Sequence, residues 1–268
     1  MIELLAANLV LLLSCMLALW LLSIAIGDVS FVDSFWAFGF VVVAAANFAV
    51  FDVGARGLSS QLLLAMTTVW GVRLALYLIL RWRREGADPR YVRMLEKAGG
   101  NPHIFSLRAV FLLQGLMLWT VSLPLQLGMF ADNAAAPTSI AWAGVALAAV
   151  GFVFESVGDA QMQAFRADAT NHGKVMDRGL WRYTRHPNYF GDCCVFWGLW
   201  LVAMDAGSPW WSIAGPLLLT WTLLRWSGAA LLERRLKRSR PGYEEYIART
   251  SAFLPWPPRK RPAAALKP

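Results

Sequence analysis

The stretch GLWRYTRHPNYFGDCCVFWGLW, residues 179–200, joins a group of basic and polar side chains to one of the most apolar parts of the chain. Pro187 breaks the chain there, so the residues that follow it, through Asp192, are expected to form the first turn of a helix. Arg185 and His186 precede this helix, and positive side chains beside a helix N-terminus make an anion site. The stretch therefore predicts a membrane helix whose polar entrance can bind an anion.

The composition of the whole chain is that of an integral membrane protein. Of its 268 residues 57% are hydrophobic and 16% are charged, and the mean hydropathy is +0.47, whereas a soluble domain carries about a quarter charged residues. A spanning helix needs about 20 apolar residues, and seven segments qualify: 4–26, 34–51, 58–81, 105–127, 138–165, 188–205 and 209–232. We expect an all-α membrane bundle of about seven helices in a single domain, with the first segment retained rather than cleaved as a signal peptide.

Basic residues gather in three connecting segments: between the third and fourth helices, between the fifth and sixth, and after the seventh. The net charge is +8. The positive-inside rule makes these segments cytoplasmic, which places the N-terminus outside and the C-terminus in the cytoplasm. Topology and contact with anionic lipid explain most of the charge of the 81–97 loop and of the tail from Pro257 onward. The dispersal of the charge among loops argues against nucleic acid as a partner. The scattered His and Cys residues have no metal-site spacing, so no metal is expected.

Charged side chains within the apolar segments are a second signal of function. Each costs roughly 2.5–3.5 kcal/mol at the centre of a bilayer on insertion scales, so such groups usually face an interior or a cavity. Arg73, Tyr77 and Arg81 are spaced i, i+4, i+8 on one face of the third segment, and Arg73 lies about 12 Å deeper than Arg81. An ion pair made only for packing is the alternative interpretation of Arg73.

The fifth segment carries an acidic stripe that includes Glu155 and Asp159 and ends at Arg166. Buried acids need cations or hydrogen-bond donors opposite them, and Arg73 and Arg225 could supply these. Alternatively, the acids accept hydrogen bonds from ribose hydroxyls and an amide, as in many nucleotide sites.

Polar groups toward the cytoplasmic ends of these helices would line one pocket that opens to the cytosol and has an apolar floor. Glu233 and Arg234 lie at the cytoplasmic exit of the seventh segment. Asp33 lies at or near the N-cap of the second segment, where a helix cap would explain it equally well, and it would reach the pocket only from the far end of its helix. Such a pocket suits a charged, water-soluble cofactor that meets a lipid-soluble substrate.

At GLWRYTRHPNYFGD the chain resembles the steroid 5-alpha-reductase-like membrane proteins, including a bacterial branch formerly described as a domain of unknown function. Similar pieces extend over most of residues 28–256, among them SFVDSFWAFGF, WGVRLALYLILR, the Gln114-Gly115 pair, DAQMQAFR and LLERRLKRSRPGYEEYIARTSAFLP. The shorter string Arg-His-Pro-x-Tyr also occurs in isoprenylcysteine and phospholipid methyltransferases, which bind S-adenosylmethionine and resemble the chain mainly in its C-terminal third.

The resemblance implies a seven-helix oxidoreductase of the bacterial inner membrane that uses NADPH to reduce the C=C bond of a 3-oxo-Δ4 steroid or a similar lipid enone. It implies a substrate pocket among the helices of residues 1–130 and a cofactor site within 138–256. Arginine suits a 2′-phosphate because its planar guanidinium forms two hydrogen bonds with an oxyanion. Together with the polar stripes, the resemblance implies these cofactor contacts: Arg73, Tyr77, Glu155, Asp159, Arg166, Lys174, Arg185, His186, Asn188, Tyr189, Asp192, Glu233 and Arg234.

The reaction also needs a hydrogen-bond donor aimed at the enone oxygen, where negative charge develops. A carboxylic acid kept protonated by an apolar pocket can serve. The resemblance implies an acid on the second segment, which aligns with Asp33, and a tyrosine on the third, whose position falls near Trp70. Tryptophan can donate an N–H but cannot transfer a proton as a phenol can, and Tyr77 lies about two turns away. The candidate catalytic residues are therefore Asp33, Trp70 and Tyr77.

Two other classes of protein are alternatives to a reductase. A lipid methyltransferase would account for the short Arg-His-Pro-x-Tyr string, but its cofactor bears no phosphate and would not need the excess of arginine. A non-enzymatic sterol or lipid binder would account for an apolar pocket but not for the polar stripes. In each case the expected partners are a lipid-soluble small molecule and membrane lipid.

Overall fold

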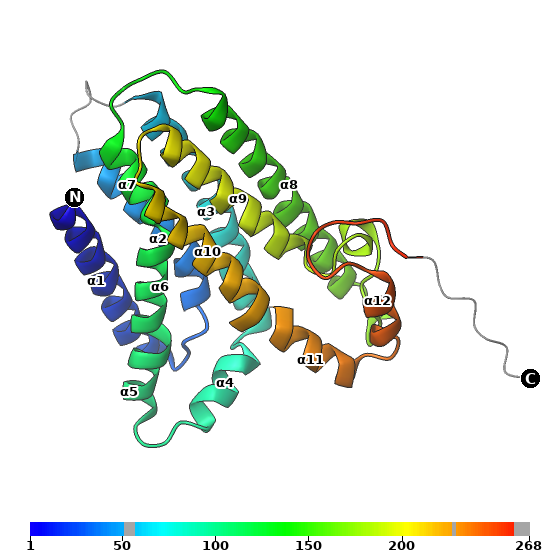
Figure 1. Cartoon of the computed structure of the whole chain (residues 1–268). Coiled ribbons are helices and arrows are strands. Elements are labelled where there is room, and N and C mark those ends of the chain that lie inside the picture. The colour runs from blue at the N-terminus through cyan, green and yellow to red at the C-terminus, as the bar shows by residue number, and fades with distance from the viewer. Residues whose placement is uncertain (51–56, 227–228, 260–268) are drawn as a thin grey trace, which may run out of the picture. The chain divides into compact units, whose positions relative to one another are not determined.

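The computed structural model describes residues 1–50, 57–226 and 229–259, and every named element in these ranges is a helix (Figure 1). Within these described ranges, five helical segments are long and apolar enough to cross a membrane. They are α1 (Ile2–Ile26), α2 (Val32–Val50), α3 (Leu58–Glu85), the continuous run of α5 (Pro102–Ser106), η2 (Leu107–Leu112) and α6 (Leu113–Val121), and α8 (Ser139–Ala167). The predicted all-α membrane bundle is confirmed.

The last two predicted spans form helices that do not belong to this group of five. The predicted segment 188–205 is α9 (Pro187–Asp205), a continuous helix with an aspartate near each end. The predicted segment 209–232 is interrupted: it contains η5 (Trp210–Ile213), α10 (Ala214–Trp221) and η6 (Thr222–Trp226), and α11 (Ala229–Ser239) begins within it. A membrane crossing by these two segments stays a prediction.

The chain divides into two compact units, which are described separately. The first comprises residues 1–145 and 199–218, and the second comprises residues 146–198 and 219–268. Among the described residues there are also three shorter α-helices: α4 (Pro89–Glu96) and α7 (Leu123–Ala131) in the first unit, and α12 (Tyr243–Arg249) in the second. The second unit also contains two short 3-10 helices, η3 (Ala169–Asn171) and η4 (Gly179–Arg182).

Close packing of α2 against α3 forms the core of the first unit. Gly71 of α3 permits the approach, because a Cβ atom there would lie 2.9 Å from the carbonyl oxygen of Ala37. Trp70 is only 1% exposed, and its ring lies edge-on to that of Phe40 with the centroids 5.7 Å apart. The indole of Trp70 is therefore a packing element of this helix pair.

A buried cluster of amides links α1, α2 and α7 within the same unit. Asn8 Nδ2 donates to Asn47 Oδ1 at 3.1 Å and to Gln126 Oε1 at 3.0 Å. Gln126 Nε2 in turn donates to Ser122 Oγ at 2.8 Å. Because a buried amide is costly unless it is hydrogen-bonded, these contacts fix the register of the three helices.

In the second unit α8 and α9 cross at a pair of glycines. A Cβ atom on Gly151 would lie 2.5 Å from the carbonyl oxygen of Gly191, and the reverse distance is also 2.5 Å. The stretch 179–192 packs around this crossing: Trp181 Nε1 donates to Gly158 O at 3.0 Å, and the Trp181 carbonyl accepts from Tyr246 Oη at 2.5 Å. This stretch therefore joins α8, α9 and α12.

Candidate active site

An acid and a phenol meet at one end of the first unit. Asp33 lies in the first turn of α2, and its Oδ1 accepts a hydrogen bond from Tyr91 Oη of α4 at 2.6 Å. Its Oδ2 accepts from Arg90 Nη2 at 3.1 Å, and the Asp33 side chain is 25% exposed. Asp33 therefore lies near the start of α2 and also accepts hydrogen bonds from two side chains of α4.

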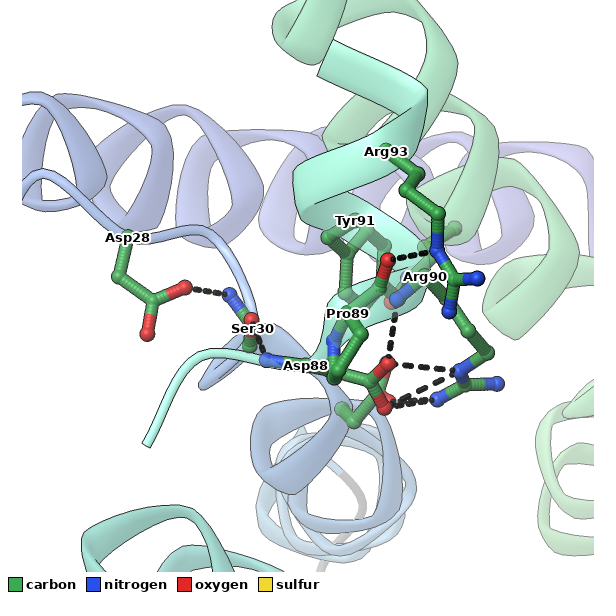
Figure 2. A network of polar contacts seen from close by, with 9 residues as sticks. Asp28, Ser30, Asp88, Pro89, Arg90, Tyr91 and Arg93 are labelled. Atoms are coloured by element: carbon green, nitrogen blue, oxygen red, sulfur yellow. Dashed lines mark hydrogen bonds and ion pairs between the residues drawn. The ribbon is translucent and has the colours of Figure 1, made fainter. Parts of the chain in front are cut away.

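The local sequence explains why α4 forms. Asp88 is its N-cap, with the side chain accepting from the Arg90 backbone N–H at 2.7 Å, and Pro89 occupies the first turn. Both are favoured helix starts. The Asp88 N–H donates to Ser30 Oγ at 2.8 Å, and the Ser30 N–H donates to Asp28 at 2.8 Å (Figure 2). These contacts tie the start of α4 to the segment that leads into α2, which holds Tyr91 against Asp33.

The Tyr91 hydroxyl has its orientation fixed from two sides. It donates to Asp33 and accepts from Gln114 Nε2 of α6 at 2.9 Å. Burial, and then the negative charge of Asp33, raise the pKa of Tyr91 well above its ordinary value. The phenol therefore keeps its proton at neutral pH and can act as a hydrogen-bond donor.

Arg90 joins the two carboxylates of this cluster. Its guanidinium contacts Asp88 Oδ2 at 2.9 Å as well as Asp33. Burial acts to raise the pKa of Asp88, but the hydrogen bonds and positive charge of Arg90 outweigh it, so the pKa lies below its ordinary value. An acid, a phenol and a cation are thus assembled where the α1–α2 connection meets α4.

The sequence predicted Asp33 but not its partners. Tyr91 and Arg90 belong to the basic segment 86–101, which overlaps the 81–97 loop whose charge we assigned to topology and lipid contact. The string ADPRYVRMLE could have revealed them, because Asp followed by Pro marks the start of a short helix. Asp33 stands beside this basic segment, so the expectation that it approaches from the far end of its helix is wrong.

Two other predicted residues of the first unit lie together on α3. The Arg73 guanidinium carbon is 5.4 Å from the centroid of the Tyr77 ring, a cation–π contact that agrees with their predicted common face. Trp70, the third predicted catalytic residue, is in the core.

In the second unit Arg185 anchors the C-terminal helices to the entrance of α9. Its Nε donates to Glu233 Oε1 at 2.8 Å and its Nη2 to Oε2 at 3.3 Å. Its Nη1 donates to the carbonyl oxygens of Thr250 at 2.7 Å and Ile247 at 3.3 Å. The side chain is 10% exposed, so these contacts favour a positioning role, and a phosphate contact by Arg185 stays a prediction.

His186 completes this cluster. It is 1% exposed, its Nε2 lies 3.0 Å from Glu233 Oε1, and its ring stacks on Tyr189 with the centroids 5.2 Å apart. Burial acts to raise the pKa of Glu233, but hydrogen bonds and charges from His186 and Arg185 outweigh it and lower the pKa to about 2. Glu233 is therefore an anion at neutral pH, and four predicted cofactor contacts are brought together.

The remaining predicted contacts of this unit fall into three groups. Glu155 and Asp159 are buried on α8, at 1% and 5% exposure. Asn188 and Asp192 lie half-buried in the first turns of α9. Arg166, Lys174 and Arg234 are exposed. The three cations are accessible to a soluble ligand and the two acids are enclosed by the protein, and a cofactor contact by any of these residues stays a prediction.

In the part of the chain that the structure describes, no three His, Cys, Asp or Glu side chains are grouped so that they could hold a metal ion.

The fold and these clusters define an all-helical membrane protein with an acid–phenol pair in one unit and a charged cluster in the other. Over residues 19–250 the chain matches the family described as protein of unknown function (DUF1295), and it belongs to this family. It is 24% identical over 268 residues to an uncharacterized protein of Schizosaccharomyces pombe, covering 88% of this chain and 75% of that protein. No solved structure matches.

Proposed function

We propose that the protein is an NADPH-dependent reductase of the C=C bond of a 3-oxo-Δ4 steroid or a similar lipid enone. The observation that carries this proposal is the 2.6 Å hydrogen bond between Tyr91 and Asp33. It supplies a phenol in direct contact with Asp33, whereas Trp70 stands at the α3 position where the resemblance implies a tyrosine. The DUF1295 family is associated with steroid 5-alpha-reductase-like proteins, which supports the same reaction.

The acid–phenol pair would act on the carbonyl oxygen of the enone. NADPH, when bound, supplies the hydride that the β-carbon receives. The Tyr91 hydroxyl would turn its proton from Asp33 to the carbonyl oxygen, where it stabilises the developing negative charge. Arg90 and Gln114 hold this hydroxyl and its acid in place. In the final step the α-carbon would take a proton from water, which gives the saturated ketone and NADP⁺.

The residues proposed to hold the cofactor are those of the second unit. Arg166, Lys174 and Arg234 would contact phosphates, and Glu155 and Asp159 would accept from ribose hydroxyls. The basic loops support a cytoplasmic position for this site, and we propose the bacterial inner membrane as the location.

Ligand-induced stabilisation of the detergent-purified protein tests the cofactor. NADPH, NADH and S-adenosylmethionine are compared side by side, because a ligand that binds only the folded state adds about 2.7 kcal/mol at a hundred times its Kd. We expect NADPH to stabilise more than NADH. A response to S-adenosylmethionine alone would overturn the proposal in favour of a methyltransferase.

Progesterone-dependent oxidation of NADPH then tests the acid–phenol pair. Tyr91→Phe removes the donor, so we expect kcat to fall by about 10²- to 10³-fold, the usual loss when one donor to a developing oxyanion is removed, with stabilisation by NADPH retained. Tyr183→Phe is the matched control, because that side chain is 42% exposed. Equal turnover by Tyr91→Phe and the natural protein would exclude Tyr91 as the donor.

A further inference from the structure

The irregular segment that follows α12, drawn in red in Figure 1, presents two large apolar side chains to solvent. Leu254 is 64% exposed and Trp256 is 69% exposed. Phe253 points inward instead, and its ring centroid lies 5.8 Å from that of Phe190. Tyr183 is also exposed, and its carbonyl oxygen accepts a hydrogen bond from the Trp256 N–H at 3.0 Å. The side chains of Tyr183, Leu254 and Trp256 are called the C-terminal patch below.

Hydrogen bonds within the second unit fix the backbone that carries this patch. Thr184 Oγ1 donates to the carbonyl oxygen of Phe253 at 2.8 Å. The Arg185 N–H donates to the carbonyl oxygen of Ser251 at 2.9 Å, and Thr184 and Ser251 pair as a single parallel β-bridge. The C-terminal patch is therefore held outward in a defined place, and an exposed apolar patch of this kind marks a site of contact.

Helix α8 shows at which level of a membrane the C-terminal patch lies. This helix is apolar and long enough to span. Val150, Val153 and Val157 are exposed and spaced on one helical face, as a lipid-facing stripe requires. Arg166 is the first exposed charged residue of α8 after Val157, and it lies about 14 Å further along the helix. The hydrocarbon region therefore ends between Val157 and Arg166.

The C-terminal patch is attached to α8 near the apolar end of this interval. Trp181 Nε1 donates to the carbonyl oxygen of Gly158 at 3.0 Å, and the Leu180 N–H donates to Gln161 Oε1 at 2.9 Å. Tyr183 follows Trp181 by two residues. The headgroup region is about 5–8 Å thick on each side of the hydrocarbon core, so the patch lies where hydrocarbon meets headgroups. Trp and Tyr are enriched at this boundary because one end of each ring system is apolar and the other is polar.

We propose that the C-terminal patch anchors the second unit in a bilayer of anionic phospholipid, with Leu254 and Trp256 inserted at the boundary between headgroups and acyl chains. Arg182 and Arg259 are exposed next to the patch in the sequence, and their charge complements that of anionic headgroups. The anchored segment is bonded to the residues that lead into α9, so the lipid contact also holds Arg185 in place. This role is independent of the proposed reduction.

Quenching by brominated lipids tests the insertion on the full chain in nanodiscs. Leu254→Cys carries an environment-sensitive fluorophore, and the labelled natural protein gives the background from its own three cysteines. We expect lipids brominated near the headgroup to remove at least about half of the fluorescence, because interfacial side chains lie about 5–10 Å into the headgroup–acyl boundary. Trp256→Cys is a second reporter, which serves if Leu254→Cys does not fold.

Ala169→Cys is the matched control for the depth of the label. Ala169 is exposed and lies beyond Ala167, the last residue of α8. A label at this position should stay in water, where brominated acyl chains do not reach it. Quenching of the two labels to the same extent would show that the method does not resolve an inserted side chain from the nearby water phase, and it would count against the anchor.

The preference for anionic lipid is tested with the double variant Arg182→Gln and Arg259→Gln. Quenching of the Leu254→Cys label by brominated phosphatidylglycerol is divided by quenching by brominated phosphatidylcholine. We expect this ratio to exceed one when both arginines are present and to fall to about one in the double variant, because each basic side chain near the surface attracts anionic lipid. The same ratio in both proteins would overturn the assignment to anionic lipid.

Two results would overturn the anchor as a whole. A label at residue 254 that iodide quenches from water and bromolipids do not quench would place the C-terminal patch outside the bilayer. A label that neither quencher reaches would show that protein rather than lipid covers the patch.

Discussion

Tyr91 holds its hydroxyl between an acceptor, Asp33, and a donor, Gln114. Burial and the carboxylate both disfavour loss of the phenolic proton, so the pKa of Tyr91 is raised well above 10. The surroundings of Tyr91 therefore keep its hydroxyl protonated, and the proposed reaction uses this hydroxyl as a hydrogen-bond donor to the enone oxygen.

An ultraviolet titration of tyrosinate checks this. The chain has six tyrosines, so the signal of Tyr91 is the difference between the natural protein and Tyr91→Phe. We expect no step in that difference near pH 10. Asp33→Asn removes the nearby negative charge and should lower the pKa of Tyr91, bringing the step toward its ordinary position. A step near pH 10 in the natural protein that disappears in Tyr91→Phe would show that the carboxylate and burial do not act as argued.

Glu233 shows the opposite effect at the residue scale. Its pKa is lowered from an ordinary value of 4.5 to about 2, so the folded state binds its proton less tightly than the unfolded state. The stabilisation is therefore complete above about pH 4.5 and is lost as the pH falls toward 2.

We expect Glu233→Gln to lower the free energy of unfolding by about 1–3 kcal/mol at pH 7. This is less than the roughly 3–5 kcal/mol for breaking a fully buried pair, because Glu233 is 17% exposed. Thermal unfolding in detergent between pH 7 and pH 3 measures it, and the gap between variant and natural protein should narrow below about pH 4.5. Glu244→Gln, at an exposed position of α12, is the control. A gap that stays constant down to pH 3 would count against the Arg185–Glu233–His186 cluster.

Among the elements, the long apolar helices were predictable because a helix that spans a membrane needs about 20 consecutive apolar residues. The start of α9 was also predictable, since Pro187 marks it and the helix begins there. The short helix α4 was missed because eight residues with alternating polar groups give no spanning signal, although its Asp-Pro start was visible.

The candidate site shows why local pattern is not enough. Asp33 and Tyr91 are 58 residues apart in the sequence, and Arg185 and Glu233 are 48 apart. Their pairing depends on how helices pack, which periodicity and caps do not specify. The i, i+4 contact of Arg73 and Tyr77 was predictable because it lies within one helix.

The crossing of α8 and α9 is a contact between elements that one methyl group should disrupt. A Cβ atom on Gly191 would lie 2.5 Å from Gly151 O and 2.6 Å from Glu155 N, both backbone atoms that cannot rotate away. We expect Gly191→Ala to destabilise the protein by about 1–3 kcal/mol, as overpacking does, measured by thermal unfolding in detergent. Gly99→Ala is the control, because its added Cβ meets nothing within 4 Å. Equal melting temperatures for the two variants would contradict the close approach.

At the scale of the whole molecule, the distribution of the net charge of +8 predicts how the chain is oriented in the membrane. The basic segment 86–101 follows α3, and the segment 132–138, which precedes α8, contains no Lys or Arg. Both segments belong to the first unit, and the helix of residues 102–121 that separates them is long enough to span. By the positive-inside rule we expect 86–101 to lie in the cytoplasm and 132–138 outside.

Cysteine labelling in intact cells of a bacterial host tests this orientation. Lys97 and Ala135 are exposed positions in the two segments, so Lys97→Cys and Ala135→Cys each present a thiol to solvent, whereas Cys193 and Cys194 are buried and Cys15 lies within α1. We expect a membrane-impermeant maleimide to label Ala135→Cys in intact cells and Lys97→Cys only after permeabilisation. The reverse pattern would place the Asp33–Tyr91 pair on the outer side, away from cellular NADPH, because Tyr91 belongs to the same basic segment as Lys97. The proposed reductase would then lack access to its cofactor, so this experiment tests the reaction as well as the topology.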